Sequence, residues 1–147
     1  MAETGELARL RRLLLLALAA GMSGLVLELV LLEHFESRTQ WVPLVALAVA
    51  LPLTLGVLAR PTRLLLRAHQ AVMAALIAIA LLGIWFHYDG NVEFELEMKP
   101  SLSGWALVKE ALHGATPSLS PGSLAWIGVI GLLATFRRGE RRGDPGG

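Results

Sequence analysis

The residues of this sequence best suited to chemistry are three histidines in its polar stretches, two of them close to a carboxylate. His34 follows Glu33, His87 precedes Asp89 by two positions, and His113 stands further along the chain. Imidazole and carboxylate groups together are suitable ligands for zinc, copper(II) and similar divalent ions. We therefore consider a metal site built from His34, His87, His113 and Asp89. Its ligands would come from separate segments, because no pair has a diagnostic spacing such as His-x-x-x-His.

The same histidines allow a second cofactor hypothesis, a bound tetrapyrrole. A b-type haem takes axial ligands that face each other across a helical bundle, and His34 and His87 could supply two. Both lie where we expect helices to end, so this alternative ranks below a metal site. The chain contains no cysteine, which excludes thiolate-ligated zinc and iron–sulfur clusters within it.

Motifs of catalysis are missing from the sequence. It has no recognisable nucleophile-and-base arrangement, no glycine-rich phosphate loop and no His-Glu-x-x-His motif. We therefore predict that the protein is not an enzyme. A net charge of +1 gives no argument for a nucleic-acid partner. The four short spans and the single intramembrane carboxylate that we predict below also offer little of the architecture of secondary transporters.

The elements that position these residues are blocks of apolar sequence. Hydrophobic residues make up 54% of the 147 residues, and the mean hydropathy is +0.59. The blocks approach the roughly 20 residues that a helix needs to cross a hydrocarbon core of about 30 Å. We predict an all-α membrane protein with four transmembrane helices, at residues 13–32, 41–59, 68–86 and 119–136. We expect residues 1–12 to form a cytoplasmic basic N-terminal segment and residues 137–147 to form a cytoplasmic disordered tail.

The distribution of lysine and arginine predicts the orientation of these spans. Ten arginines fall in the two terminal segments and the second connection, whereas the other two connections carry Arg38, Lys99 and Lys109. The positive-inside rule then places both termini in the cytoplasm. The ten are Arg9, Arg11, Arg12, Arg60, Arg63, Arg67, Arg137, Arg138, Arg141 and Arg142.

One carboxylate, Glu28, lies inside the first predicted span. Ala17, Gly21, Gly24 and Glu28 follow one another at spacings of 4, 3 and 4, so they share one face of a helix. Small residues allow close helix packing, and we expect this face to point into the bundle. The indole N–H of Trp126, at matching depth in the fourth span, could donate to the carboxylate. Packing alone would also account for Glu28 as a hydrogen-bonded or protonated group.

The longest connection, residues 87–118, is predicted to form an outer cap. Asp89-Gly90-Asn91 is typical of a turn, and the next residues alternate between apolar and acidic side chains, which is the period of a strand. An amphipathic helix should follow, from Ser103 to about Leu112. A lone strand is unstable, so a partner protein could cover its apolar face. The predicted docking residues are Val92, Phe94, Leu96, Met98 and Trp105.

Four segments carry a resemblance to a known kind of protein. Residues 86–97 and 114–122, together with Leu31-Leu32-Glu33-His34 and Gln40-Trp41-Val42-Pro43-Leu44, resemble a family of small, uncharacterised bacterial four-helix integral membrane proteins. The resemblance implies the same topology and a home in the bacterial inner membrane. It brings no activity, cofactor or catalytic residue with it.

These observations favour a protein that works through contacts. The leading hypothesis is a non-catalytic accessory or assembly subunit, which packs its spans against a larger membrane complex and docks a partner through the outer cap. Its expected partners are membrane lipids and other membrane-protein subunits, or further copies of itself, and no nucleic acid. An extracytoplasmic metal-handling or metal-sensing protein and a tetrapyrrole-binding subunit are the alternatives.

Overall fold

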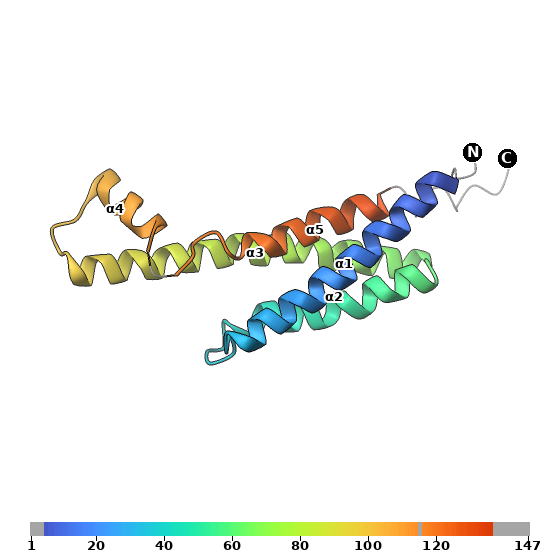
Figure 1. The fold of residues 1–147 in the computed structure, drawn as a ribbon, viewed down its shortest axis with the longest axis horizontal. Helices are drawn as coiled ribbons and strands as arrows, with labels where there is room; N and C mark the ends of the chain where they lie inside the picture. Colours follow the sequence, from blue (N-terminus) through green and yellow to red (C-terminus); the bar gives the residue numbers. More distant parts are fainter. Residues whose placement is uncertain (1–4, 115, 137–147) are drawn as a thin grey trace.

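The computed structural model describes residues 5–114 and 116–136, and these residues are all-α, with no strand among them (Figure 1). The helices are α1 (Gly5–Leu31), α2 (Trp41–Ala59), α3 (Arg63–Met98), α4 (Gly104–Leu112) and α5 (Gly122–Thr135). Helices α1, α2 and α3 are long and apolar enough to cross a membrane, whereas α5 is a shorter apolar helix of 14 residues. The chain is therefore a helical, multi-pass membrane protein.

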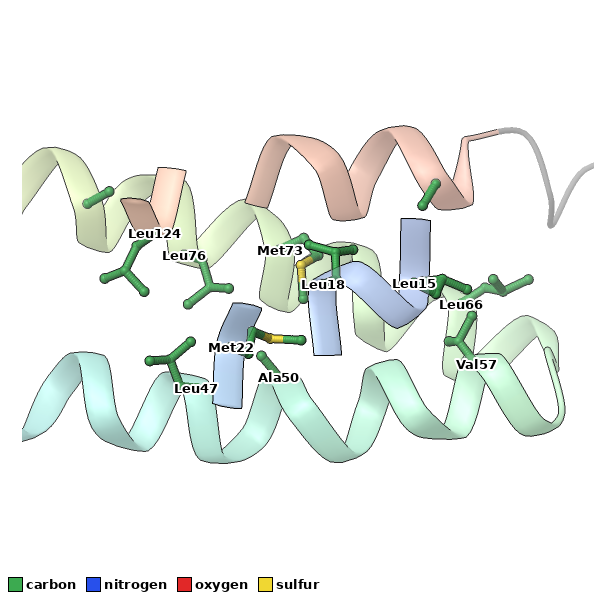
Figure 2. Close-up of a cluster of buried hydrophobic side chains, with 12 residues drawn as sticks. Leu15, Leu18, Met22, Leu47, Ala50, Val57, Leu66, Met73, Leu76 and Leu124 are labelled. Carbon is green, nitrogen blue, oxygen red and sulfur yellow. The ribbon is translucent and has the colours of Figure 1, made fainter. Parts of the chain in front are cut away.

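Leucine, alanine and methionine form the core of the four-helix bundle made by α1, α2, α3 and α5 (Figure 2). Leu15, Leu18 and Met22 point from α1 toward α2 and α3, at spacings of 3 and 4 that put them on one helical face. The other elements contribute Leu47, Ala50 and Val57 from α2, Leu66, Met73, Leu76 and Ala80 from α3, and Leu124 and Ala134 from α5.

Glycines allow α5 to approach α3 closely. A Cβ atom added at Gly128 would lie 2.5 Å from the backbone oxygen of Met73, and one added at Gly131 would collide with the Met73 side chain. His69 lies beside Gly131, is fully buried, and has no hydrogen-bond partner on either ring nitrogen within residues 5–114 and 116–136. In lipid the hydrophobic effect does not drive helices together, so helices in membranes often associate through small residues that allow close packing.

Two side chains from other helices bind the carbonyl groups at the end of α5. Arg11 Nη2 donates to the Phe136 oxygen at 2.8 Å, and Gln70 Nε2 donates to the Thr135 oxygen at 3.1 Å. The last carbonyl groups of a helix have no hydrogen-bond donor within the helix itself. Arg11 and Gln70 provide these donors for α5. They fix the start of α1 and the end of α5 at the same end of the bundle.

The predicted strand is wrong, because α3 continues as a helix through Met98. Asp89, Gly90 and Asn91 lie inside this helix instead of forming a turn. Glutamate, leucine and methionine are strong helix formers, and a helix satisfies its own backbone hydrogen bonds whereas a lone strand cannot. The side-chain spacing therefore follows the helical period of 3.6 residues, and Glu95 lies 4.0 Å from Lys99 one turn later.

The predicted orientation of the Glu28 face is also wrong. Ala17, Gly21, Gly24 and Glu28 are all exposed, and a Cβ atom added at Gly21 or Gly24 would meet nothing within 4 Å. Helix α1 contacts the bundle through its leucines and Met22 instead. Large apolar side chains fill the space between helices and bury more area than glycine or alanine, which decides which face turns inward.

The length of α3 divides the molecule into a bundle and a projection. At about 1.5 Å per residue its 36 residues are about 54 Å long, roughly 24 Å more than a hydrocarbon core of about 30 Å. The 21 steps from Arg67 to Tyr88 cover about 31 Å, which matches that core. Figure 1 shows the rest of α3 extending beyond the bundle, with α4 folded back along it.

Candidate functional site

The candidate site is the projecting part of the chain, residues 88–114 and 116–121, which we call the arm. It contains the last third of α3, the connection to α4, α4 itself, and the return segment, residues 116–121, that leads into α5 (Figure 1). Helix α4 packs on α3 through the buried Ala111 and the half-buried Leu107 and Val108. Its opposite face is exposed and carries Trp105, which is 77% exposed.

Asn91 of α3 holds the arm together. Its side chain is 2% exposed, and its Nδ2 atom lies 2.9 Å from the Ala111 oxygen, 2.7 Å from the Thr116 oxygen and 3.1 Å from Ser118 Oγ. Its Oδ1 atom accepts from the Thr116 amide at 3.1 Å. One side chain therefore joins α3 to the end of α4 and to the return segment.

Three positions on one face of α3 receive the returning chain. They are Gly83, His87 and Asn91, which are four residues apart. A Cβ atom added at Gly83 would lie 2.9 Å from Pro121 Cβ, and His87 Nδ1 lies 3.1 Å from the Pro117 oxygen. Gly114 is equally constrained, since an added Cβ would come within 2.6 Å of the Asn91 side chain.

Sequence reasoning missed this role of Asn91. Its position after Asp89 and Gly90 indicated a turn, although an asparagine within a helical stretch must satisfy two donors and an acceptor elsewhere. The small and turn-forming residues Gly114 to Ser118 were the matching signal, because such a segment can place backbone groups around a side chain.

An acidic stripe runs along the exposed side of the arm. Asp89, Glu93 and Glu97 are spaced by four residues and are all exposed, so their carboxylates follow one line on α3. At 3.6 residues per turn, this acidic stripe lies between Leu96 on one side and the pair Phe94 and Met98 on the other. The arm thus presents negative charge flanked by apolar side chains.

The predicted docking residues do not share one face. Phe94 is 47% exposed and Met98 is 67% exposed, and both lie on the same side of α3. Leu96 lies across the acidic stripe from them, and Val92 is half-buried. Trp105 lies on the face of α4 that points away from α3. A strand would have aligned the first four residues, whereas a helix separates them.

The structure brings together two of the four predicted metal ligands. The ring centres of His34 and His87 are 6.4 Å apart, with a tilt of 57° between the rings. His34 lies in the connection between α1 and α2, and His87 lies at the base of the arm. Partial burial lowers the pKa of His34 from the usual histidine value, and the neighbouring His87 lowers it further.

The other two predicted ligands lie elsewhere. His113 is exposed at the end of α4, where its Nδ1 atom lies 2.8 Å from the Lys109 oxygen. Asp89 is exposed in the acidic stripe. Within residues 5–114 and 116–136, no group of three or more histidine, aspartate or glutamate side chains is arranged to hold a metal ion. The tetrapyrrole hypothesis stays a prediction.

Glu28 and Trp126 are not joined in the part of the chain that the structure describes. Both side chains are exposed, Trp126 by 69%, and neither forms a hydrogen bond or ion pair with another described residue. Glu28 therefore lies on the side of α1 that faces away from the bundle core, about one turn before that helix ends. A carboxylate in that position faces whatever surrounds the bundle.

Aromatic side chains mark the level at which the arm leaves the bundle. The ring centres of Phe35 and Trp41 are 6.3 Å apart, and those of Trp85 and Tyr88 are 6.4 Å apart. Tryptophan and tyrosine collect at the boundary between lipid and water. The histidine pair, His34 and His87, lies next to these aromatic residues in the sequence, and the arm with its acidic stripe extends from this level of the bundle (Figure 1).

Comparison of the chain with protein-family models, with curated proteins and with solved structures gave no match.

Proposed function

We propose that this protein is a non-catalytic accessory or assembly subunit of a larger membrane complex, and that its arm docks a partner protein. The observation that carries this proposal is the acidic stripe, flanked by Leu96 on one side and by Phe94 and Met98 on the other. These side chains lie on the part of α3 that stands clear of the bundle. The acidic stripe and Leu96 are on the side of α3 away from Asn91, whereas Phe94 and Met98, three and seven residues after Asn91, are exposed at the border of the face that binds α4 and the return segment. The face is ordered by the arm's own contacts and is open to a partner.

The negative charge of this face indicates what kind of partner would bind it. Three carboxylates in line attract a segment rich in lysine or arginine, and complementary charge raises the association rate and selects among partners. The flanking apolar side chains add the buried contacts from which most affinity comes. A basic amphipathic helix has both features, so we propose that a basic segment with apolar side chains along one edge occupies this face.

A second surface supports membership of a complex within the membrane. Ala17, Gly21 and Gly24 leave open space on α1, and Glu28 stands on the same face. Small residues let a neighbouring helix come close, and a carboxylate near lipid is stabilised by a polar group from that helix. The spans of a larger complex would supply both.

We also propose an orientation for the subunit, from the position of its arginines. Arg11 lies where α1 begins and α5 ends, and Arg60, Arg63 and Arg67 lie around the turn from α2 to α3 at that end of the bundle (Figure 1). The positive-inside rule assigns this end to the cytoplasm and the arm to the outer side of a bacterial inner membrane. Helix α5 is about 21 Å long and, together with the return segment, would complete a fourth span.

Co-purification from native membranes tests the proposal. The full chain, extracted in mild detergent, should be found by native mass spectrometry with other polypeptides in a near-constant ratio. Reversing charge with Glu93→Lys and Glu97→Lys together should lower the recovered partner at least about ten-fold, because both changes oppose a basic partner. Phe94→Ser should also lower it, by removing an apolar contact.

A matched control separates docking from general charge effects. Glu36→Lys makes the same charge reversal at an exposed carboxylate in the connection between α1 and α2, off the arm. It should leave the recovered partner unchanged. Recovery of the chain alone, or equal loss of partner in the control and in the stripe variants, would contradict docking through the acidic stripe.

A further inference from the structure

The histidine pair offers two nitrogen ligands at the base of the arm, apart from the docking face. His34 and His87 are 53 positions apart in the sequence, yet their ring centres lie within 6.4 Å. Neither ring belongs to the hydrophobic core, and both lie at the level of the aromatic residues that mark the boundary with water. The separation is close to that of the Phe35–Trp41 and Trp85–Tyr88 rings, but in this pair both rings carry nitrogen atoms that can ligate a metal ion.

The hydrogen bond of His87 fixes which of its nitrogens is available. Its Nδ1 atom lies 3.1 Å from the carbonyl oxygen of Pro117, and a carbonyl can only accept. The proton of the neutral ring is therefore on Nδ1, and Nε2 keeps its lone pair. A backbone carbonyl that binds the second nitrogen is the arrangement usual for histidines that ligate metals, since it sets the tautomer and the ring orientation.

The other ring is also suited to act as a ligand. The His34 ring forms no hydrogen bond with another residue in the described part of the chain; only the backbone amide of His34 does, to the Leu29 oxygen at 2.8 Å. Partial burial lowers the pKa of His34, which favours the neutral ring with a lone pair on one nitrogen. A metal ion and a proton compete for that lone pair, so a neutral imidazole binds metal more readily.

The separation of the rings suits a shared ion. A metal–nitrogen bond of about 2.0–2.1 Å puts the ion about 3.2 Å from the centre of each ring. Two rings on one ion then have centres about 5 Å apart at a tetrahedral angle and about 6.4 Å apart in a line. The observed 6.4 Å between ring centres lies at the wide end of this range, so the two rings are close enough to share one ion.

We propose that His34 and His87 together bind one late transition-metal ion, with copper(II) bound more tightly than zinc. Imidazole nitrogen suits copper, zinc and nickel, and copper(II) heads the general order of affinity among divalent ions. Two protein ligands leave the remaining positions to water or to a group from outside. The site is therefore open, and its ion is exchangeable in a way that a closed structural site is not.

Equilibrium dialysis of the full chain in detergent, with copper(II) and then zinc as the only added metals, tests the site. We expect one copper ion per chain that the double variant His34→Ala with His87→Ala does not bind, and weaker binding of zinc. Each single variant should weaken copper binding at least about ten-fold. Electron paramagnetic resonance of the copper-loaded protein should show two imidazole nitrogens, and the double variant should lose that signal.

Two further variants serve as controls, one for copper binding to other histidines and one for loss of the folded arm. His113→Ala removes an exposed histidine that lies on α4 and should bind copper like the unchanged protein. His87→Gln keeps an N–H donor for the Pro117 oxygen, so the arm should stay folded while copper binding falls. Copper binding that survives in His87→Gln or in the double variant, or that is lost in His113→Ala, would overturn the proposal.

Discussion

Replacing Asn91 with alanine should release α4 from α3 while the bundle stays folded. The change removes the two amide hydrogens that serve the Ala111 oxygen, the Thr116 oxygen and Ser118, and it removes the acceptor of the Thr116 amide. All of these contacts lie within the arm, and the buried leucines and methionines of the bundle are untouched. The effect should therefore be local.

The magnitude follows from the number of groups that lose a partner. A hydrogen bond contributes about 0.5–1.5 kcal/mol net, and a buried group left without a partner costs about 1–3 kcal/mol. Four hydrogen bonds of Asn91 are lost, but only the Thr116 oxygen and amide lose their partner, because Ser118 Oγ still donates to the Ala111 oxygen at 3.3 Å. The stability of the arm should therefore fall by about 2–4 kcal/mol. At about 1.4 kcal/mol per factor of ten, the open form of the arm should become about 30 to 700 times more populated.

Hydrogen exchange followed by mass spectrometry measures this population directly. The amides of α4 should exchange faster in Asn91→Ala by that factor, while those of α1 and α2 should keep their rates. Gly90→Ala is the matched control, because an added Cβ there meets nothing within 4 Å, and alanine favours a helix by about 0.5–1 kcal/mol. Unchanged exchange in α4 of Asn91→Ala would refute the role we give to this side chain.

Two further predictions test the bundle and the histidine pair. Gly128→Ala should destabilise the packing of α3 on α5 by about 1–3 kcal/mol, because the added Cβ would lie 2.5 Å from the Met73 oxygen. Gly21→Ala is the control, because the Cβ added there lies in open space and should not destabilise the protein. Thermal unfolding of the two variants in detergent tests this difference. The pKa of His34 is lower in the folded protein than the 6.5 expected in the unfolded chain, so the unfolded chain binds more protons at pH values between the two. The free energy of unfolding should therefore fall as the pH decreases through this range. The fall should be smaller in His34→Gln, which lacks the titrating ring. A melting temperature that rises on acidification in that range would contradict the second prediction.

Much of the bundle could be predicted from hydropathy alone. The predicted span 41–59 coincides with α2, and the spans 13–32 and 68–86 fall almost entirely within α1 and α3. Apolar blocks of membrane length leave few alternatives to a helix. The inward face of α1 was predicted wrongly, because the spacing of small residues shows that they share a face but not which neighbour that face meets.

The arm could not be predicted because its pattern fits two periods. Seven residues that alternate between apolar and acidic side chains match a strand, yet glutamate, leucine and methionine also favour a helix. A strand in this segment would require α3 to end at Asp89. Asn91, two residues later, binds the Ala111 oxygen and the Thr116 amide from within α3, so the helix continues past Asp89. Contacts across 20 to 53 positions, such as those of Asn91 and of the histidine pair, leave no local signal in the sequence.

His87 links the two proposals, because it takes part in both arrangements. Its Nδ1 atom binds the return segment of the arm, and its ring lies against His34 of the connection between α1 and α2. A metal ion on the pair would hold that connection against the base of the arm. If the ion changes the affinity of the docking face for its basic partner, the partner must change the affinity for the ion by the same factor. Copper titrations with and without the partner would measure this coupling, and His87→Gln, which keeps the bond to Pro117, would remove it without releasing the arm.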